Sequence, residues 1–163
     1  MIEIPLISNA ERSRKAEIVN DEWERDFLKE ITVDAIIENI DIVTDLVNEE
    51  LEAVGCPLKF QVQIDVAIDE LFGNIARYAY KDGTGKATVR LEIEDDPSCA
   101  VLTFVDQGIP FDPLGIPEPD TTLSLKERKI GGLGIFLVKK TMDDMTYQYK
   151  DGQNILRIKK KLR

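Results

Sequence analysis

The stretch that decides the fold is Asp69–Tyr80, which reads DELFGNIARYAY. Apolar residues recur there and just before it at spacings of three and four, which predicts an amphipathic helix with one buried side: Ile64, Ala67, Ile68, Leu71, Ile75 and Ala79. Glu70 and Asn74 are four residues apart and Arg77 follows three later, so we expect these polar side chains to share one ridge. A polar ridge beside a buried face is either a solvated edge or a functional site.

A second polar group follows a predicted apolar strand, Ala100–Val105. Asp106 ends this strand and is a good acceptor for an amino group. Gly108 follows two residues later and allows the backbone to turn and to approach a flat ligand closely. Phe111 can fold back as an apolar wall. Taken alone, the Asp-Gln-Gly sequence is most often only a turn.

A third group is the glycine-rich stretch Gly131–Gly134, which precedes a predicted helix through Met142. Glycines before a helix start leave backbone N–H groups exposed, and the helix dipole favours an anion there. The stretch therefore predicts a phosphate cradle, although the chain contains no G-x-x-x-x-G-K-[ST] motif. A tight loop or a helix cap is the simpler alternative for this stretch alone.

The composition limits the class of protein. The chain has 163 residues, of which 43% are apolar, so it is long enough for one domain with a sizeable core. A net charge of −10 argues against general nucleic-acid binding, which needs a basic surface. Neither an apolar run long enough to span a membrane nor a secretory leader is present. The two cysteines are too few for a disulfide framework, so we expect a cytoplasmic protein.

The chain contains no histidine. This absence excludes a Ser-His-Asp triad, a Cys-His pair, a histidine-based zinc site and a phosphohistidine. Any catalytic base must therefore be Asp, Glu, Lys, Tyr or a bound water.

The remaining sequence predicts a two-layer α+β domain. Residues 1–25 are polar and irregular and read as a weakly ordered extension, with one short strand at Ile2–Leu6, and residues 26–163 form the single domain. The expected elements in chain order are strand Phe27–Val33, helices Val33–Val54 and Leu58–Tyr80, strands Ala87–Glu94 and Ala100–Val105, a long loop Asp106–Ile130, helix Gly131–Met142, and strands Met145–Lys150 and Ile155–Lys161. This order predicts an α/β sandwich, with helices on one face of a mixed, largely antiparallel sheet.

Three stretches together resemble a known superfamily. DELFGNIARYAY, VDQGIPFDP and GGLGIF look like the N, G1 and G2 boxes of the GHKL (Bergerat-fold) ATPases. Within that superfamily the chain most resembles the small bacterial anti-sigma-factor serine/threonine kinases, over roughly residues 27–161. The resemblance implies binding of ATP with Mg²⁺.

The resemblance also implies roles for single residues. Glu70 looks like the general base that deprotonates the attacking hydroxyl, and Asn74 looks like the Mg²⁺ ligand. Asp106 looks like the acceptor for the adenine amino group, with Gly108 beneath the ring. Phe111 begins a segment, through Ile130, that looks like the ATP lid.

Further positions are implied to contact the nucleotide. Arg77 stands where the family often has a basic residue near phosphate. The phosphate-contacting hinge of the lid looks like Gly132, Leu133, Gly134 and Ile135. The resemblance provides no counterpart of a P-loop lysine, and Arg128 and Lys129 in the lid are candidates for contacting the γ-phosphate.

The function implied is that of a serine/threonine protein kinase that sequesters a sigma factor and phosphorylates an anti-anti-sigma antagonist. The resemblance also suggests a homodimer that touches neither nucleic acid nor membrane. One alternative is an ATP-gated binding module without phosphoryl transfer, which has no need for a base such as Glu70. Another is a sensor-kinase-like ATPase domain acting alone, which is disfavoured because the chain has no phosphoacceptor histidine.

Overall fold

The architecture is a two-layer sandwich, seen in a computed structural model that describes residues 28–95, 98–120, 122 and 132–163. One five-stranded sheet has the order β1-β2-β3-β5-β4, and every neighbouring pair is antiparallel. Its strands are β1 (Leu28–Asp34), β2 (Lys86–Glu94), β3 (Cys99–Asp106), β4 (Asp144–Lys150) and β5 (Gln153–Lys161). The predicted α+β class is confirmed. Among the described residues the sheet contains no parallel pair, so it is antiparallel rather than mixed.

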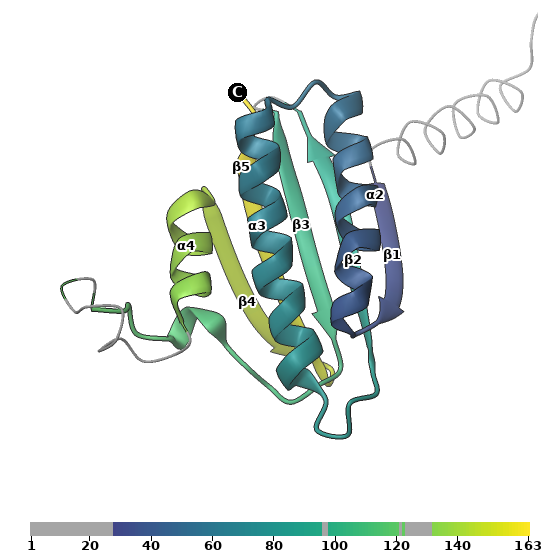
Figure 1. The fold of residues 1–163 in the computed structure, drawn as a ribbon, viewed down its shortest axis with the longest axis vertical. Helices are drawn as coiled ribbons and strands as arrows, with labels where there is room; N and C mark the ends of the chain where they lie inside the picture. Colours follow the sequence, from purple (N-terminus) through teal and green to yellow (C-terminus); the bar gives the residue numbers. More distant parts are fainter. Residues whose placement is uncertain (1–27, 96–97, 121, 123–131) are drawn as a thin grey trace, which may run out of the picture.

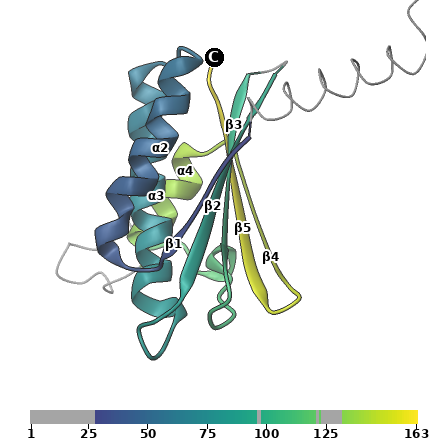
Figure 2. The ribbon, with the colours of Figure 1, turned by 90° about the vertical axis from the view of Figure 1, so that its right-hand side faces the viewer.

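Among the described residues, three α-helices form the second layer. They are α2 (Ile40–Ala53), α3 (Leu58–Asn74) and α4 (Leu133–Thr141), and all of them cover the same face of the sheet (Figure 2). The central helix, α3, lies between the other two (Figure 1). This arrangement places the end of α3, the start of α4 and the ends of the central strands at one end of the molecule.

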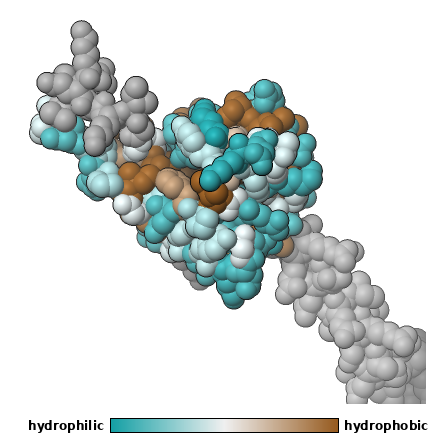
Figure 3. Space-filling model, turned by 90° about the horizontal axis from the view of Figure 1, so that it is seen from below, coloured by the Kyte–Doolittle hydropathy of each residue, from teal (hydrophilic) through white to brown (hydrophobic). Residues whose placement is uncertain are grey.

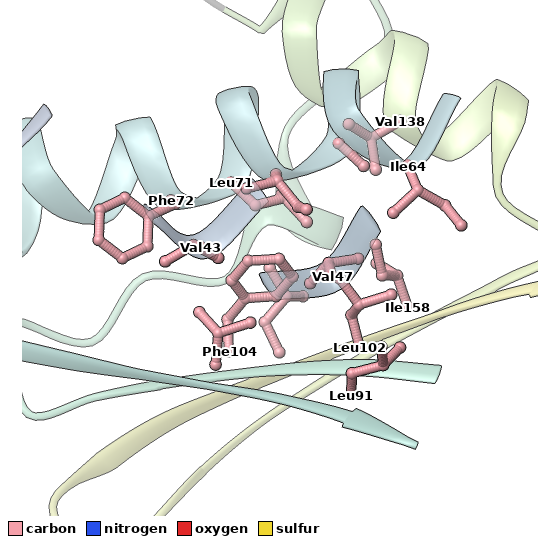
Figure 4. Close-up of a cluster of buried hydrophobic side chains, with 14 of the residues drawn as sticks. Val43, Val47, Ile64, Leu71, Phe72, Leu91, Leu102, Phe104, Val138 and Ile158 are labelled. Carbon is pink, nitrogen blue, oxygen red and sulfur yellow. The ribbon is translucent and has the colours of Figure 1, made fainter. Parts of the chain in front are cut away.

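The core lies between the helices and the sheet (Figure 4). β2 and β5 alternate buried and half-buried residues, as expected for strands with one face packed on a core. The inward strand side chains meet the apolar sides of α2 and α3, and the central members of this cluster are Val43, Val47, Ile64, Leu71, Phe72, Leu91, Leu102, Phe104 and Ile158. The predicted buried side of the helix before Tyr80 is confirmed, because all six of its residues belong to this core.

The helix predicted at Val33–Val54 begins later than expected. Val33 and Asp34 close β1 and pair with Ala87 and Lys86 of β2, so the chain is still extended there. After a short 3₁₀ turn, Ile37–Asn39, α2 starts at Ile40. The β-branched run before Val33 favours the strand, and the Asn39 amide donates to the Asp34 carbonyl at 2.9 Å across the bend.

The second predicted helix, Leu58–Tyr80, is continuous but not uniform. Its α-helical part ends at Asn74, and Ile75–Ala79 forms a π-helical turn, in which the hydrogen bonds span five residues. Insertions of this kind are rare and occur often at functional sites. The turn shifts the residues after Asn74 away from the positions that a regular α-helix gives them.

The last hairpin is confirmed. β4 and β5 pair around Asp151 and Gly152, which both have positive φ angles (53° and 75°), as a two-residue type I′ turn requires. Outside the described residues lie the predicted strand Ile2–Leu6, the proposed extension 1–25, Arg128 and Lys129. Among the residues that are described, no helix is long and apolar enough to cross a membrane.

Candidate functional site

A cavity opens at one end of the molecule, where α3 and α4 meet the end of β3 and the start of β5. It encloses about 550 Å³, counting the part that opens to solvent. Most of the side chains lining it are apolar or aromatic, and the polar ones among the described residues, apart from two tyrosines, are Asn74, Asp106 and Asn154. Figure 3 looks at this end of the molecule and shows hydrophobic residues gathered at its surface. A largely apolar cavity with a few convergent polar groups is typical of a small-molecule site.

Asp106 is the buried carboxylate of the cavity, only 6% exposed. Its Oδ1 accepts hydrogen bonds from the Gly108 backbone N–H and from the Asn154 amide, both at 2.9 Å. Burial raises the pKa of Asp106 above its usual range, and these two hydrogen bonds partly offset the increase. Because both bonds go to Oδ1, the second oxygen is left to accept a donor from a ligand.

Asn154 is a polar residue of the cavity that sequence reasoning missed. Its amide donates to Asp106 and to the Ile109 carbonyl (3.0 Å), and its Oδ1 accepts from the Tyr147 hydroxyl (2.6 Å) and the Phe111 N–H (3.1 Å). One buried side chain therefore ties β3, the loop after it and β4 together. The available signal was its position: Asn154 is polar at an inward-facing, buried step of β5.

The structure places Gly108 directly against the end of the π-helical turn. A Cβ at this position would overlap the backbone carbonyl and the side chain of Ala79 at the end of the π-helical turn. The next residue, Ile109, donates its N–H to the same carbonyl at 2.9 Å. The glycine therefore lets the loop pack against the end of the helix, and it does not line the cavity. Phe111 does line the cavity and is 49% exposed, which suits the apolar wall that was predicted.

Glu70 of α3 contacts Gly134 at the start of α4, where the two helices pack against each other. A Cβ at Gly134 would overlap the Glu70 carboxylate, so this carboxylate lies directly against the first turn of α4. The N-terminal turn of a helix presents free N–H groups to anions. The predicted base and the predicted phosphate cradle, 64 positions apart in the sequence, are therefore adjacent. Asn74, one turn after Glu70, lines the cavity.

The other residues of the glycine-rich stretch differ in conformation and in whether they line the cavity. Gly132 has a φ of 84°, a left-handed conformation that favours glycine, and it precedes α4 as its N-cap. Ile135 is buried and lines the cavity, whereas Leu133 is 39% exposed and does not line it. Gly131 lies outside the described residues.

Arg77, which was expected on one ridge with Glu70 and Asn74, is not among the residues that line the cavity. The Arg77 side chain is exposed, and its Nη1 lies 2.8 Å from where a Cβ on Gly73 would be. It therefore runs back over Gly73 and does not line the cavity. Arg77 belongs to the π-helical turn, Ile75–Ala79.

Part of the predicted lid is held by α4. Lys139 donates to the carbonyls of Leu114 (3.2 Å) and Ile116 (3.5 Å), and Lys140 pairs with Glu118 at 3.7 Å. The Asp112 side chain accepts from the Leu114 N–H at 2.9 Å and caps the short 3₁₀ turn that follows. These contacts hold the segment between Asp112 and Glu118 against α4.

A metal ion in this site would depend on its ligand. Among the described residues, no group of three or more His, Cys, Asp or Glu side chains could hold a metal alone. Asn74 offers one amide oxygen at the phosphate end of the cavity. Mg²⁺ commonly binds through one or two protein oxygens together with phosphates and water, so this donor set fits a nucleotide-borne Mg²⁺.

Comparison with known proteins places these features in a family. Residues 33–160 match the family model described as a histidine kinase-like ATPase domain. The serine/threonine-protein kinase BtrW of Bordetella bronchiseptica is 28% identical over 98 residues, covering 60% of this chain and 68% of that protein. The serine-protein kinase RsbW of Bacillus licheniformis is 30% identical over 99 residues, covering 56% of this chain and 59% of that protein.

Solved structures also share the fold. The RsbU and RsbW domains of Rv1364c from Mycobacterium tuberculosis superpose with a TM-score of 0.59 at 18% identity, covering 83% of this chain and 32% of that chain. A relative of this low identity supports the fold alone. Among the curated relatives, the match to the serine-protein kinase RsbW of Bacillus cereus spans 60% of the length of that protein.

Proposed function

Because the chain belongs to the histidine kinase-like ATPase family, we propose that it binds ATP with Mg²⁺ in this cavity and transfers the γ-phosphoryl group to a serine or threonine of a partner protein. The observation that carries the proposal is the contact between the Glu70 carboxylate and the first turn of α4. A protein that only binds a nucleotide has no need for a carboxylate beside its phosphates. A kinase needs one there to accept a proton.

The two ends of the cavity take different parts of the nucleotide in this proposal. Asp106 accepts a hydrogen bond from the adenine amino group through its second oxygen, and the ring lies against the apolar wall that includes Phe111. The N–H groups at the start of α4 face the phosphates. Asn74 supplies an oxygen to Mg²⁺, which when bound neutralises charge on the phosphate oxygens.

Glu70 is the proposed general base. It orients the incoming hydroxyl and takes its proton as the hydroxyl oxygen bonds to the γ-phosphorus and the bond to the bridging oxygen of ADP breaks. In phosphoryl transfer the protein acts mostly through positioning and electrostatics, so a well-placed carboxylate is sufficient. No step of the transfer is assigned to Arg77, whose exposed side chain lies over Gly73.

The partner proteins are proposed from the resemblance and from the names of the relatives. Relatives named serine/threonine- and serine-protein kinases support a protein substrate rather than a metabolite. The resemblance to anti-sigma-factor kinases supports a sigma factor as the bound partner, an anti-anti-sigma antagonist as the substrate, and a homodimer in the cytoplasm. The genes beside the one that encodes this chain are the place to seek both partners.

The test separates binding from chemistry. Glu70→Gln keeps the shape of the side chain but loses its basicity, so we expect ATP affinity near that of the wild type and phosphoryl transfer reduced by roughly 10²–10⁴. Asn74→Ala should lose both, because the metal ligand is lost. The matched control is Glu92→Gln, the same change on the opposite face of the sheet. Calorimetry measures ATP affinity, and γ-labelled ATP with the candidate antagonist measures transfer.

Two outcomes would contradict the proposal. Transfer by Glu70→Gln at the wild-type rate would make Glu70 a structural residue. A wild-type protein that transfers nothing, yet binds a partner only with ATP, would establish the gated-binding alternative instead.

A further inference from the structure

An exposed apolar row continues the ridge of α3 that carries Glu70 and Asn74. Leu58, Val62 and Val66 precede Glu70 at steps of four residues and are 73%, 51% and 42% exposed. Residues four apart lie one turn above another, so the row leads from the far end of α3 to the proposed base and then into the cavity. Leucine and valine side chains that are this exposed contribute little to the stability of the single chain.

Leu137 of α4 extends the same surface. Gly134 at the start of α4 contacts Glu70, and Val138, one turn later, lies near Ile64 in the core (Figure 4). Because Ile64 precedes Glu70 in α3, the two helices run antiparallel. Leu137 is 44% exposed and lies about one turn after Gly134 in α4. Val66 lies one turn before Glu70 in α3, so the two side chains are at a similar height along the antiparallel helices. The outer sides of α3 and α4 lie next to each other (Figure 1). We call Leu58, Val62, Val66 and Leu137 the α3–α4 patch.

Acidic residues border this patch on the α2 side. Asn48 of α2 lies beside Asp65 of α3, which identifies the side of α2 that faces α3. Asp41 and Asp45 are seven and three residues before Asn48, and Glu52 is four residues after it, so all three lie on that side of the helix. All three are exposed. A partner that covers the patch meets apolar side chains with negative charge along one border.

We propose that the α3–α4 patch docks the protein that accepts the phosphoryl group, through an apolar contact bordered by lysine or arginine residues near its serine or threonine. This inference rests on the proposed phosphoryl transfer. Asn74, one turn after Glu70, lines the cavity where the nucleotide binds, whereas Glu70 itself does not, so we expect the hydroxyl to reach Glu70 from the solvent side of α3. The patch begins one turn from Glu70 on that side, and its acidic border complements a basic partner.

The test replaces single exposed apolar residues with glutamate. Val62→Glu and Leu137→Glu should each raise KM for the acceptor protein identified in the transfer assay by about tenfold, the scale of losing one strong interface contact. The expected kcat and the affinity for ATP stay at wild-type values. The matched control is Ile42→Glu on α2, where the side chain is 50% exposed but lies off the patch; its KM should stay unchanged. Raising the salt concentration should raise the wild-type KM, because salt screens the acidic border.

Each other outcome overturns the inference. An unchanged KM in both variants, or a lower ATP affinity, means that the patch does not dock the acceptor. Light scattering that shows a dimer becoming a monomer in Val62→Glu assigns the patch to a second copy of the chain. A KM that falls when residues 1–27 are removed assigns it to that segment. A wild-type protein that phosphorylates no partner overturns the proposed function as well, and so the two failures are distinguishable.

Discussion

The two ends of the cavity are built differently. At the Asp106 end, one buried asparagine connects Asp106, Ile109, Phe111 and Tyr147 through hydrogen bonds of 2.6–3.1 Å. At the Glu70 end, a carboxylate rests against the first turn of α4 through a contact that depends on the missing side chain of Gly134. The first end is preformed by the protein. The second provides space and free N–H groups that a ligand completes.

This difference implies separate consequences for stability and for chemistry. Polar groups buried in a connected network cost free energy when one partner is removed, whereas groups that wait for a ligand cost little in the free protein. The Asp106 end should therefore affect the stability of the ligand-free protein, and the Glu70 end should affect mainly the reaction. The experiments that follow address this comparison.

The largest effect is expected from Gly134→Ala. The added methyl group overlaps the Glu70 carboxylate, so either the carboxylate rotates away or α4 shifts. We expect phosphoryl transfer to fall by at least roughly 10², because small displacements of a catalytic group are costly. The control is Gly115→Ala, where the nearest atom to an added Cβ, an Asp112 carboxylate oxygen, is 4.0 Å away. If Gly134→Ala transfers at the wild-type rate, the Glu70–Gly134 contact is unimportant for the reaction.

An intermediate effect is expected from Asn154→Ala. It leaves Asp106, Tyr147 and two backbone groups without their partner, so the free energy of unfolding should fall by about 2 kcal/mol, within the usual range for unsatisfied buried polar groups. Urea unfolding without nucleotide measures this loss. Asn74→Ala, the matched amide at the other end, should unfold within about 0.5 kcal/mol of the wild type. Equal losses in the two variants would remove the distinction between the ends.

The smallest effect is a pH dependence. Burial raises the pKa of Asp106 in the folded protein, so the folded state binds more protons than the unfolded chain in the interval just above the ordinary pKa of an aspartate. Stability of the ligand-free protein should therefore decrease as pH rises through that interval, and Asp106→Asn should reduce this slope. Asp65, whose pKa is also raised by burial, contributes with the same sign, so Asp65→Asn is the companion variant. Glu94, whose pKa is lowered by its hydrogen bond with Lys159, contributes with the opposite sign. Urea unfolding across this interval measures both, and a slope unchanged in Asp106→Asn would contradict the assignment.

ATP binding should have the opposite sign. The adenine amino group needs an acceptor, so affinity should fall as pH decreases and Asp106 takes up a proton. Asp106→Asn should weaken ATP binding by about 1–3 kcal/mol at neutral pH, since one polar contact is left unmatched. Calorimetry at two pH values separates this effect from the stability change.

Sequence spacing by itself determined the parts of this protein that depend on local order. The four-residue step from Glu70 to Asn74 places both on one ridge, the alternation in β2 and β5 gives the sheet its buried face, and the glycines before Leu133 mark the start of α4. These features follow from backbone periods of 3.6 and 2, which any stretch of the chain expresses without reference to the rest.

Only the tertiary structure decided the contacts between distant segments. Asn154 reaches Asp106 because β5 pairs with β3 across 48 positions, and Gly108 is needed because Ala79 ends the π-helical turn beside it. The pairing with β2 keeps Val33 extended where its period suits a helix. Local periodicity cannot predict these outcomes, because each depends on which segments the packed core brings together.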